Sequence, residues 1–365
     1  MQVPFVSLDR QYLNMRDELI AEFDRIGYSG IYIMGDTLER FEAEAAAYCE
    51  VPFALGVANG SDGLFLILKA LDIGPGDEVI TCPNSFIATA WVIVAAGARP
   101  VFVDVTEDYN IDPTLLERAI TPRTKAIIPV HLTGRPADMD RVNDIARHRR
   151  IAVVEDAAQA IGARYKGRRV GSLGTAASFS LHPIKNLGIM GDGGIVTTDS
   201  RGIYERISKL RNHGLRNRDE CEIWGYNSRL DPLQAGFASI KLKRLDAWNQ
   251  RCREIASRYR EGLSDVVWVP RDRDHEESVY HTFVIQLEER DRLVEYLSRH
   301  GIGSRIHYPI PIHLQECANP LGYGLGAFPV TERLARRILS LPIYPDLTDA
   351  EISHVIASVR SFFQA

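Results

Sequence analysis

The chain has 365 residues, of which 45% are hydrophobic and 25% are charged, and its formal net charge is −5 at pH 7. A chain of this size and composition buries one large core and a second, smaller one, so two domains are expected. The negative net charge argues against nucleic acid or an anionic membrane as the main partner, because attraction to a polyanion needs a basic surface.

The cysteines and the N-terminal segment favour an intracellular protein. The five cysteines are scattered, with no Cys-x-x-Cys pair or metal-like cluster. We therefore expect no metal site and a reduced, cytoplasmic location. The segment from Met1 lacks a basic region followed by an apolar one, and no uncharged apolar run of about 18 residues occurs. Neither export nor a membrane span is expected.

Short apolar runs alternate with amphipathic segments through the first 200 residues. The apolar runs predict strands at residues 54–57, 78–82, 100–103, 126–130, 152–155, 176–180 and 194–197. Helical patterns lie between the earlier runs, at residues 62–71, 87–96, 113–120 and 138–148. This alternation is typical of an α/β fold, with a mostly parallel sheet sandwiched by helices. Ligands of such sheets bind at the carboxyl ends of the strands.

The pattern changes after about residue 231. Residues 232–259 predict one long helix, and a polar, proline-bearing break follows it. Beyond the break the sequence predicts a strand at 280–286, a helix at 290–300, a proline-rich loop at 307–313 and two helices, the last starting with a capping box at Thr348. We expect a large domain over residues 1–245 and a smaller C-terminal α/β domain over 246–365.

Two strand ends carry the side chains of a cofactor site. Asp156 comes directly after the strand at 152–155, and Ser180 and Lys185 lie five residues apart where the strand at 176–180 ends. A lysine that forms a Schiff base, an aspartate that pairs with a pyridinium nitrogen and a serine that helps to hold a phosphate are the protein half of a pyridoxal phosphate (PLP) site. The sequence therefore predicts PLP as the cofactor.

Motifs along the whole chain resemble the DegT/StrS-type sugar aminotransferases of PLP fold type I. In chain order they are Asn59-Gly60-Ser61-Asp62, Gly74-Pro75-Gly76-Asp77-Glu78, Pro129-Val130-His131-Leu132, Glu155-Asp156-Ala157-Ala158-Gln159, His182-Pro183-Ile184-Lys185-Asn186, Gly191-Asp192-Gly193-Gly194, Arg211-Asn212-His213-Gly214 and Gly225-Tyr226-Asn227-Ser228-Arg229. The resemblance runs from about Pro4 to the C-terminal helix and includes residues 307–313. The ordered set is specific, whereas any one motif alone is weak.

The resemblance implies roles for the residues around the cofactor ring. Lys185 is expected to form the Schiff base and then to move the proton between substrate and cofactor. Asp156 is expected to keep the ring nitrogen protonated, Gln159 to face the phenolic oxygen and Phe86 to stack on the ring. Taken one by one, these residues also fit a loop lysine, a helix cap, a surface glutamine and a core aromatic. Thr133 stands where many relatives have tyrosine.

A second group is expected to hold the phosphate. Gly60-Ser61-Asp62 leads into a helix, whose first N–H groups can bind an anion, and Ser61 and Ser180 add hydroxyl groups. Taken alone, Asn59-Gly60-Ser61 is also typical of a turn followed by a helix cap. The resemblance implies that Asn227 reaches the phosphate of the other subunit. A homodimer with shared active sites is therefore expected.

Substrate contacts are less constrained by the sequence. His182, His307 and His313 are candidates for sugar hydroxyl groups, with structural histidines as the alternative. Arg229 and Arg305 are candidates for a nucleotide diphosphate, although arginines on exposed loops are commonly only solvated.

The resemblance implies an aminotransferase that takes an amino group from L-glutamate, passing through the pyridoxamine phosphate (PMP) form, and transfers it to a nucleotide-linked keto sugar. Residues 224–231 and 305–315 are most similar to enzymes that aminate dTDP-3-keto-6-deoxyhexoses. The alternatives are a 4-keto sugar, a keto-cyclitol or a non-catalytic regulatory role. A dehydratase of this fold is expected to carry histidine in place of Lys185, and a regulatory relative to lack Lys185, Asp156 or the phosphate loop.

Overall fold

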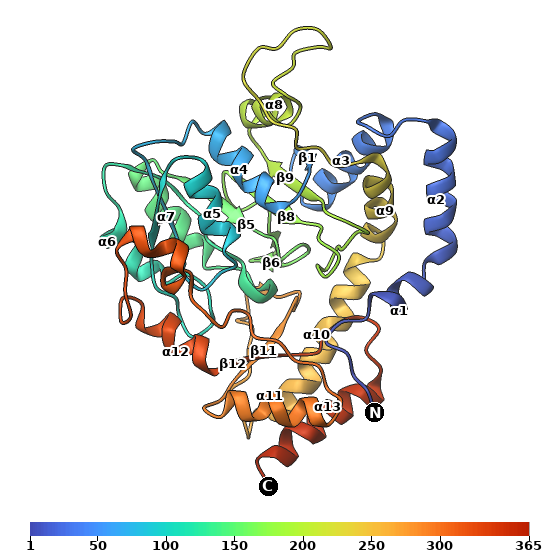
Figure 1. Ribbon diagram of the computed structural model, residues 1–365, viewed down its shortest axis with the longest axis vertical. Helices are drawn as coiled ribbons and strands as arrows, with labels where there is room; N and C mark the ends of the chain where they lie inside the picture. Colours follow the sequence, from blue (N-terminus) through green and yellow to red (C-terminus); the bar gives the residue numbers. More distant parts are fainter. Residues whose placement is uncertain (365) are drawn as a thin grey trace.

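The computed structural model describes residues 1–364, and its centre is a large mixed sheet (Figure 1). Within these residues the sheet has seven strands in the order β1-β9-β8-β5-β4-β2-β3. Their bounds, in that order, are Phe53–Val57, Gly194–Thr198, Ala176–Ser180, Ala152–Asp156, Thr124–Ile127, Glu78–Thr81 and Arg99–Phe102. The pairs from β8 to β3 are parallel, and β9 runs antiparallel to both neighbours. The predicted fold class and strands are confirmed.

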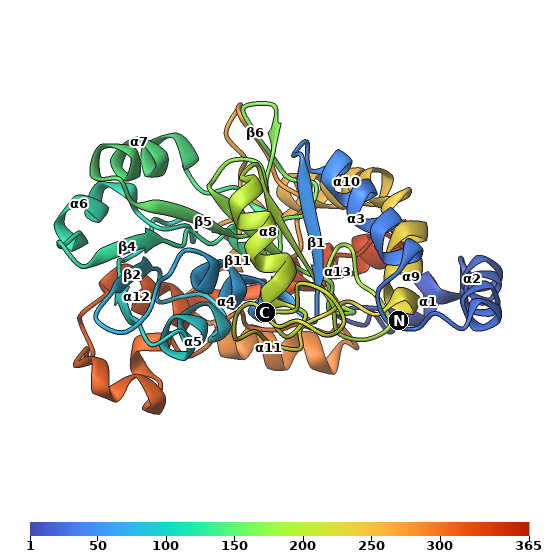
Figure 2. The same cartoon turned by 90° about the horizontal axis from the view of Figure 1, so that it is seen from above.

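Helices cover both faces of this sheet, as Figure 2 shows for α5 and α7. One face packs on α4 (Gly60–Ala70), α5 (Ala88–Ala95) and α8 (Arg201–Leu210). The other packs on α3 (Asp36–Tyr48), α7 (Met139–Arg149) and α9 (Pro232–Leu242). Because the strands are buried on both faces, their residues are apolar almost throughout. These apolar runs allowed the strands to be predicted from the sequence. The segment predicted as a helix at 113–120 is a 3₁₀ turn, Pro113–Leu115, followed by the short α6, Leu116–Ala119.

The prediction of one long helix over residues 232–259 is wrong. The structure has α9 and then α10 (Leu245–Leu263), separated by a tight turn. The N–H of Arg244 donates to the carbonyl of Lys241, three residues back, so the helical pattern breaks there. The turn lets α9 pack on the core of the large sheet and α10 pack on a second core. No glycine or proline marks it in the sequence.

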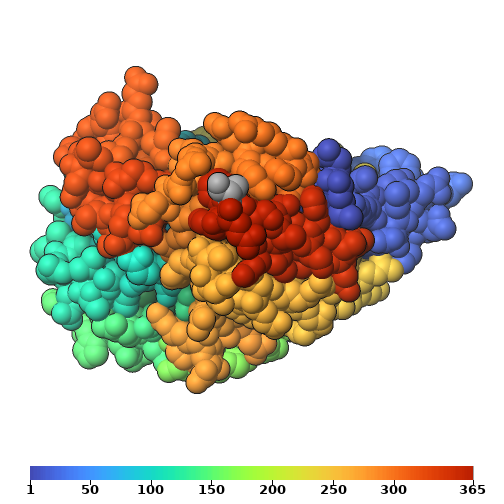
Figure 3. All heavy atoms as spheres, turned by 90° about the horizontal axis from the view of Figure 1, so that it is seen from below, coloured from blue at the N-terminus to red at the C-terminus, as the bar shows by residue number. Residues whose placement is uncertain are grey.

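The second core belongs mainly to the C-terminal third of the chain. Here β11 (Phe283–Gln286) pairs antiparallel with β12 (Ile338–Leu341), between α10, α11 (Arg290–Arg299) and α13 (Asp349–Phe362). The capping box at Thr348 is confirmed. Shorter elements of the C-terminal third are the 3₁₀ turns at Ile312–Leu314 and Glu316–Leu321 and α12 at Pro329–Arg337. The strand β10 (Glu276–Glu277) pairs with β6 (Arg164–Tyr165), which pairs with β7 (Arg168–Arg169), in a small separate sheet. Figure 3 shows α13, in red, on the lower face.

The N-terminal segment projects from the side of the molecule. It forms α1 (Leu8–Leu13) and α2 (Arg16–Ser29), which the sequence analysis did not predict (Figures 1 and 3). Several large apolar side chains here are exposed: Leu13, Phe23, Tyr28, Ile31, Tyr32 and Ile33. Among residues 1–364, no helix combines the length and the apolar character needed to cross a membrane.

Candidate active site

A cavity of about 640 Å³ lies at the carboxyl ends of β5 and β8. It is lined by predicted residues from segments far apart in the chain, namely Gly60, Ser61, Asp62, Phe86, Asp156, Gln159, Ser180, His182, Lys185 and His307. Parallel strands end at the same edge of a sheet, so the loops after β5 and β8 meet there. The volume suits a small-molecule ligand.

Asp156 is a buried carboxylate at the end of β5, 5% exposed. Its Oδ2 accepts a 2.7 Å hydrogen bond from the hydroxyl of Thr89, and its Oδ1 accepts a 3.2 Å bond from the N–H of Ala158. Burial raises the pKa of Asp156, while the two hydrogen bonds and the charge of Lys185 act in the opposite direction. In the described part of the chain Asp156 has no salt-bridge partner, so its charge is open to a cation in the cavity.

Lys185 lies on a tight loop after β8. Its N–H donates to the carbonyl of His182 over 2.8 Å, and its side chain lines the cavity. Burial lowers the pKa of the Lys185 amine to about 8, although the charge of Asp156 acts in the opposite direction. Near pH 8 about half of such amines are neutral and can act as nucleophile or base.

The N-terminus of α4 forms the third wall of the cavity. The side chain of Asn59 caps the helix by accepting a 2.8 Å bond from the N–H of Asp62. Helix geometry leaves the N–H groups of Gly60 and Ser61 without intrahelical partners. A Cβ at Gly60 would lie 2.9 Å from the Cβ of Ser180, so glycine lets the helix end approach β8. This end of the cavity is suited to an anion.

Gln159 is held in one orientation by the segment after β4. Its Oε1 accepts a 2.8 Å hydrogen bond from the backbone N–H of Thr133. Thr133 has a φ of 63°, an unusual value for a β-branched residue. Because Oε1 is held by the N–H of Thr133, Nε2 is the group of Gln159 that can donate to Tyr308 or to a ligand in the cavity.

An aromatic and histidine group lines the remaining side. Phe86 is 54% exposed, and its ring lies 5.7 Å from that of Tyr308, tilted by 44°. His307 shares a 2.9 Å hydrogen bond with the hydroxyl of Ser340. Burial, with the charges of Lys185 and Arg305, lowers the pKa of His307 to about 4, so it is neutral at pH 7.

Four predicted site residues lie outside this cavity in the single chain. Asn227 is exposed and forms a backbone bridge with Asn212. Arg229 donates to Asn212 Oδ1 over 2.9 Å, and Arg305 is exposed. His313 is buried and shares a 3.0 Å hydrogen bond with Glu332.

Other residues line the cavity and were not singled out from the sequence. They include Ser85, Thr89, Trp91, Asp192, His281 and Tyr308. Asp192 and Tyr308 lay inside recognised motifs, and Thr89 is three residues beyond Phe86. His281 belongs to the segment before β11, far from any motif. Burial, and then the charge of Lys185, lowers its pKa well below the usual value.

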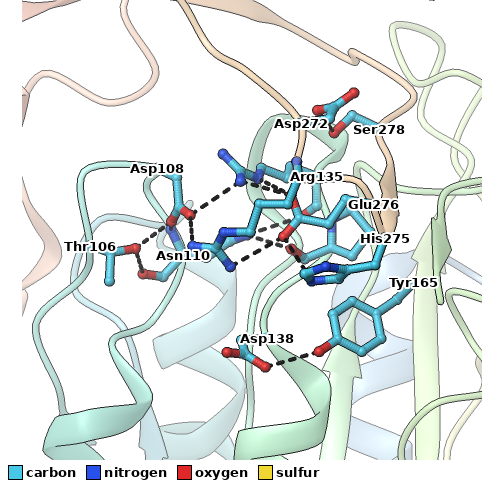
Figure 4. Close-up of polar contacts among 12 residues, drawn as sticks. Thr106, Asp108, Asn110, Arg135, Asp138, Tyr165, Asp272, His275, Glu276 and Ser278 are labelled. Atoms are coloured by element: carbon cyan, nitrogen blue, oxygen red, sulfur yellow. Dashed lines mark hydrogen bonds and ion pairs between the residues drawn. The ribbon is translucent and has the colours of Figure 1, made fainter.

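A charged network braces the segment that carries His281. The guanidinium of Arg135 lies 2.7 Å from Glu276 and 3.4 Å from Asp108, with Arg135 and Glu276 both buried (Figure 4). Arg273 contacts Asp108 at 2.9 Å. The network joins the loop after β4 to residues 272–278, next to His281. No cluster of metal-binding side chains occurs within residues 1–364.

The model of the DegT/DnrJ/EryC1/StrS aminotransferase family matches residues 14–360 of the chain. One relative, a dTDP-3-amino-3,4,6-trideoxy-alpha-D-glucose transaminase of Streptomyces venezuelae, is 44% identical over 364 residues, which are 99% of this chain and 96% of that protein. Another, named a pleiotropic regulatory protein, from Geobacillus stearothermophilus, is 42% identical over 369 residues, covering 100% of this chain and 99% of the relative.

Solved structures of aminotransferases are similar to this chain over nearly its whole length. That of S. venezuelae DesV in complex with a ketimine intermediate has a TM-score of 0.97 and 45% identity, covering 99% of this chain and 98% of that one. NtdA from Bacillus subtilis, with bound cofactor PMP, has a TM-score of 0.94 and 30% identity, covering 100% of this chain and 86% of that one. The chain therefore belongs to the DegT/DnrJ/EryC1/StrS aminotransferase family and has the fold of PLP-dependent sugar aminotransferases, as its sequence predicted.

Proposed function

We propose that this protein uses PLP to transfer an amino group from L-glutamate to a nucleotide-linked keto sugar. The observation that carries the proposal is the convergence of Lys185, Asp156 and the N-terminus of α4 on one cavity. When bound, PLP supplies a reactive aldehyde and an electron-withdrawing ring. The residues of this chain bind and orient that group and move protons beside it.

Asp156 fits a pyridinium nitrogen. It is a buried carboxylate whose described contacts are hydrogen-bond donors rather than cations. A buried carboxylate is stabilised in its charged form by a nearby positive charge. Asp156 would hold the ring nitrogen protonated, with Thr89 fixing the orientation of the carboxylate.

Lys185 is the better of two lysines with a lowered pKa for attachment of the cofactor. Burial lowers the pKa of both Lys185 and Lys241 to about 8. The amine of Lys241 donates to Gly188 O over 2.6 Å and to Gln11 Oε1 over 2.7 Å. These two hydrogen bonds hold the Lys241 amine away from the cavity. Lys185 lines the cavity, and its amine has no hydrogen-bond partner among residues 1–364. It would carry the cofactor and then transfer the proton at the substrate carbon.

The other contacts follow from the cavity walls. Gly60, Ser61 and Ser180 would bind the phosphate, and Asp62 stays engaged with the Asn59 cap. Gln159 would donate to the phenolic oxygen through Nε2. The exposed face of Phe86 would be covered by the cofactor ring.

The substrate class is supported by the relatives. A dTDP-3-keto-6-deoxyhexose is the substrate that we favour, because the S. venezuelae relative is named for a dTDP-3-amino sugar. His182 and His307, both on the cavity wall, would contact the sugar. Arg229 and Arg305 would bind the diphosphate from outside the cavity, and His313 would have an indirect role.

The proposal also includes the division into two domains, the homodimer and the cytoplasmic location. We retain a large domain over 1–245 and a small one over 246–365, supported by the separate second core. A homodimer is supported by the exposed apolar side chains on the N-terminal segment and by Trp224, which is 95% exposed near Asn227. Asn227 would complete the phosphate site of the partner. All five cysteines are free in the described chain, which suits a cytoplasmic location.

A regulatory role is the second candidate, because the G. stearothermophilus relative is named a regulatory protein. The two candidate functions, amino transfer and regulation, require different residues in the cavity. A purely regulatory protein has no need for an amine of lowered pKa facing a buried carboxylate, and here both are present.

The test is an assay of the purified protein with PLP, L-glutamate and a panel of keto-sugar nucleotides, including 3-keto and 4-keto sugars and keto-cyclitols. Mass spectrometry would detect replacement of the carbonyl oxygen by an amine. Amination of a 3-keto dTDP sugar is the expected result. Tight PLP binding without amination of any acceptor would instead favour the regulatory role.

A further inference from the structure

The loop that presents Lys185 is held from behind by one face of α9. This helix lies between the large sheet and α2 (Figures 1 and 2). Gln234 and Lys241 are seven residues apart, which is about two helical turns, so their side chains share a face. Both side chains contact the loop backbone.

Gln234 binds the far end of the loop through both atoms of its amide. Its Oε1 accepts from the N–H of Met190 over 3.1 Å, and its Nε2 donates to the carbonyl of Met190 over 2.9 Å. Because these two bonds engage the N–H and the carbonyl of the same residue, they hold the peptide groups on both sides of the Met190 Cα.

Lys241 binds the middle of the loop from a buried position. The residue is 5% exposed, and its amine donates to Gly188 O and to Gln11 Oε1. Within residues 1–364 it has no carboxylate partner. Burying an unpaired ammonium is unfavourable, as the lowered pKa of Lys241 reflects, so ordinary packing does not explain its presence.

The loop is packed so tightly that a shift of one residue moves its neighbours. A Cβ at Gly188 would lie 2.1 Å from the carbonyl oxygen of Pro183 and 3.0 Å from that of Lys185. The N–H of Ile189 donates to Leu181 O over 2.9 Å. Displacing Gly188 would therefore displace the backbone of Lys185.

We propose that Gln234 and Lys241 are positioning residues that hold the loop of residues 181–190 so that the Lys185 amine faces the cavity. Lys241 also links this loop to α1 through Gln11, so the N-terminal segment and the loop share one anchor. The inference rests on the proposed function only in taking Lys185 as the attachment point of PLP.

The test compares Lys241→Met with Lys243→Met. Lys243 caps the same helix end and is exposed, so it is a matched control. In cofactor-free protein, hydrogen–deuterium exchange of the Lys185 and Ile189 amides should become at least tenfold faster in Lys241→Met and stay unchanged in Lys243→Met. PLP attachment to residue 185, trapped with borohydride and mapped by mass spectrometry, should become at least tenfold slower in Lys241→Met only.

Gln234→Leu provides a second variant in case Lys241→Met does not fold, because Gln234 is neutral and only half-buried, so its replacement leaves the buried Lys241 and its two hydrogen bonds in place. It should give the same two changes. Wild-type exchange and attachment rates in the folded variants would overturn the proposal. If wild-type protein carries no PLP at residue 185 while the variants still exchange faster, the anchoring of the loop stands and the proposed function fails.

Discussion

The hydroxyl of Thr89 donates a 2.7 Å hydrogen bond to Oδ2 of Asp156. Thr89 also lies 2.8 Å from the hydroxyl of Ser85, so the start of α5 holds the carboxylate through two linked hydroxyl groups. Hydrogen bonds to a carboxylate favour its charged form. The chain thus offsets part of the cost of burying Asp156 before any ligand arrives.

Thr89→Val should slow amino transfer by about 10- to 100-fold, because a hydrogen bond to a charged group contributes about 1.5–3 kcal/mol. Its loss should raise the pKa of Asp156 further and weaken its hold on a ring cation. The measurement is the single-turnover rate of PLP-loaded protein with L-glutamate. Thr89→Ser keeps the hydroxyl and should stay near the wild-type rate. Equal rates in the Val and Ser variants would show that the Thr89 hydroxyl group does not contribute to amino transfer.

Lys185→Ala should abolish turnover while the protein still folds and binds PLP, since phosphate and ring contacts come from other residues. Loss of a group that transfers protons costs about 10²–10⁴-fold in rate, and loss of the attachment point adds to that. Turnover and PLP affinity should be measured on the same preparation. A variant that keeps most of its activity would show that another residue carries the cofactor.

Attachment of PLP to the cofactor-free protein should speed up as the pH rises through about 8, because burial lowers the pKa of Lys185 to about 8. Only the neutral amine attacks a carbonyl. Below the pKa the amine is protonated, with about one in ten neutral at pH 7, and above it the rate should level off. Absorbance changes on mixing with PLP would give the profile. A rate still rising steeply near pH 10 would indicate a solvated lysine.

The strands of the large sheet were predictable because burial on both faces makes each strand apolar in sequence, although the strand predicted at 126–130 lies at Thr124–Ile127. The break between α9 and α10 was not, since it depends on which core each half packs against. Residues 243–244 carry no helix breaker. The strand β12 was also not predicted. Its four residues follow α12 directly, with no turn residue between them, and they form a strand because they pair with β11.

The cavity was predictable where a residue lay in a local motif. Lys185 and Asp156 stand at strand ends, and parallel pairing of β5 and β8 brings those ends together. His281 comes from a segment whose sequence has no cofactor signature, and it reaches the cavity through tertiary packing. Gly134 permits that approach, because a Cβ there would lie 2.9 Å from the backbone nitrogen of His281.

The proposal that two subunits share each active site can be tested by mixing two inactive variants, Lys185→Ala and Asn227→Asp. Asn227 is exposed in the single chain and lies outside its own cavity. Aspartate at this position would add a negative charge beside the phosphate of the partner, so repulsion should expel the cofactor from that site. Each variant alone should be folded, dimeric and inactive.

In a mixed dimer one site would carry both defects and the other neither. Random exchange of subunits gives about half mixed dimers with one good site each, so roughly a quarter of wild-type activity should return. Subunit exchange should be verified by native mass spectrometry, and unmixed samples serve as controls. If exchange occurs and no activity returns, Asn227 serves the site of its own chain. The exposed loop around Trp224 would then need a different explanation, since its apolar surface would no longer be tied to a shared site.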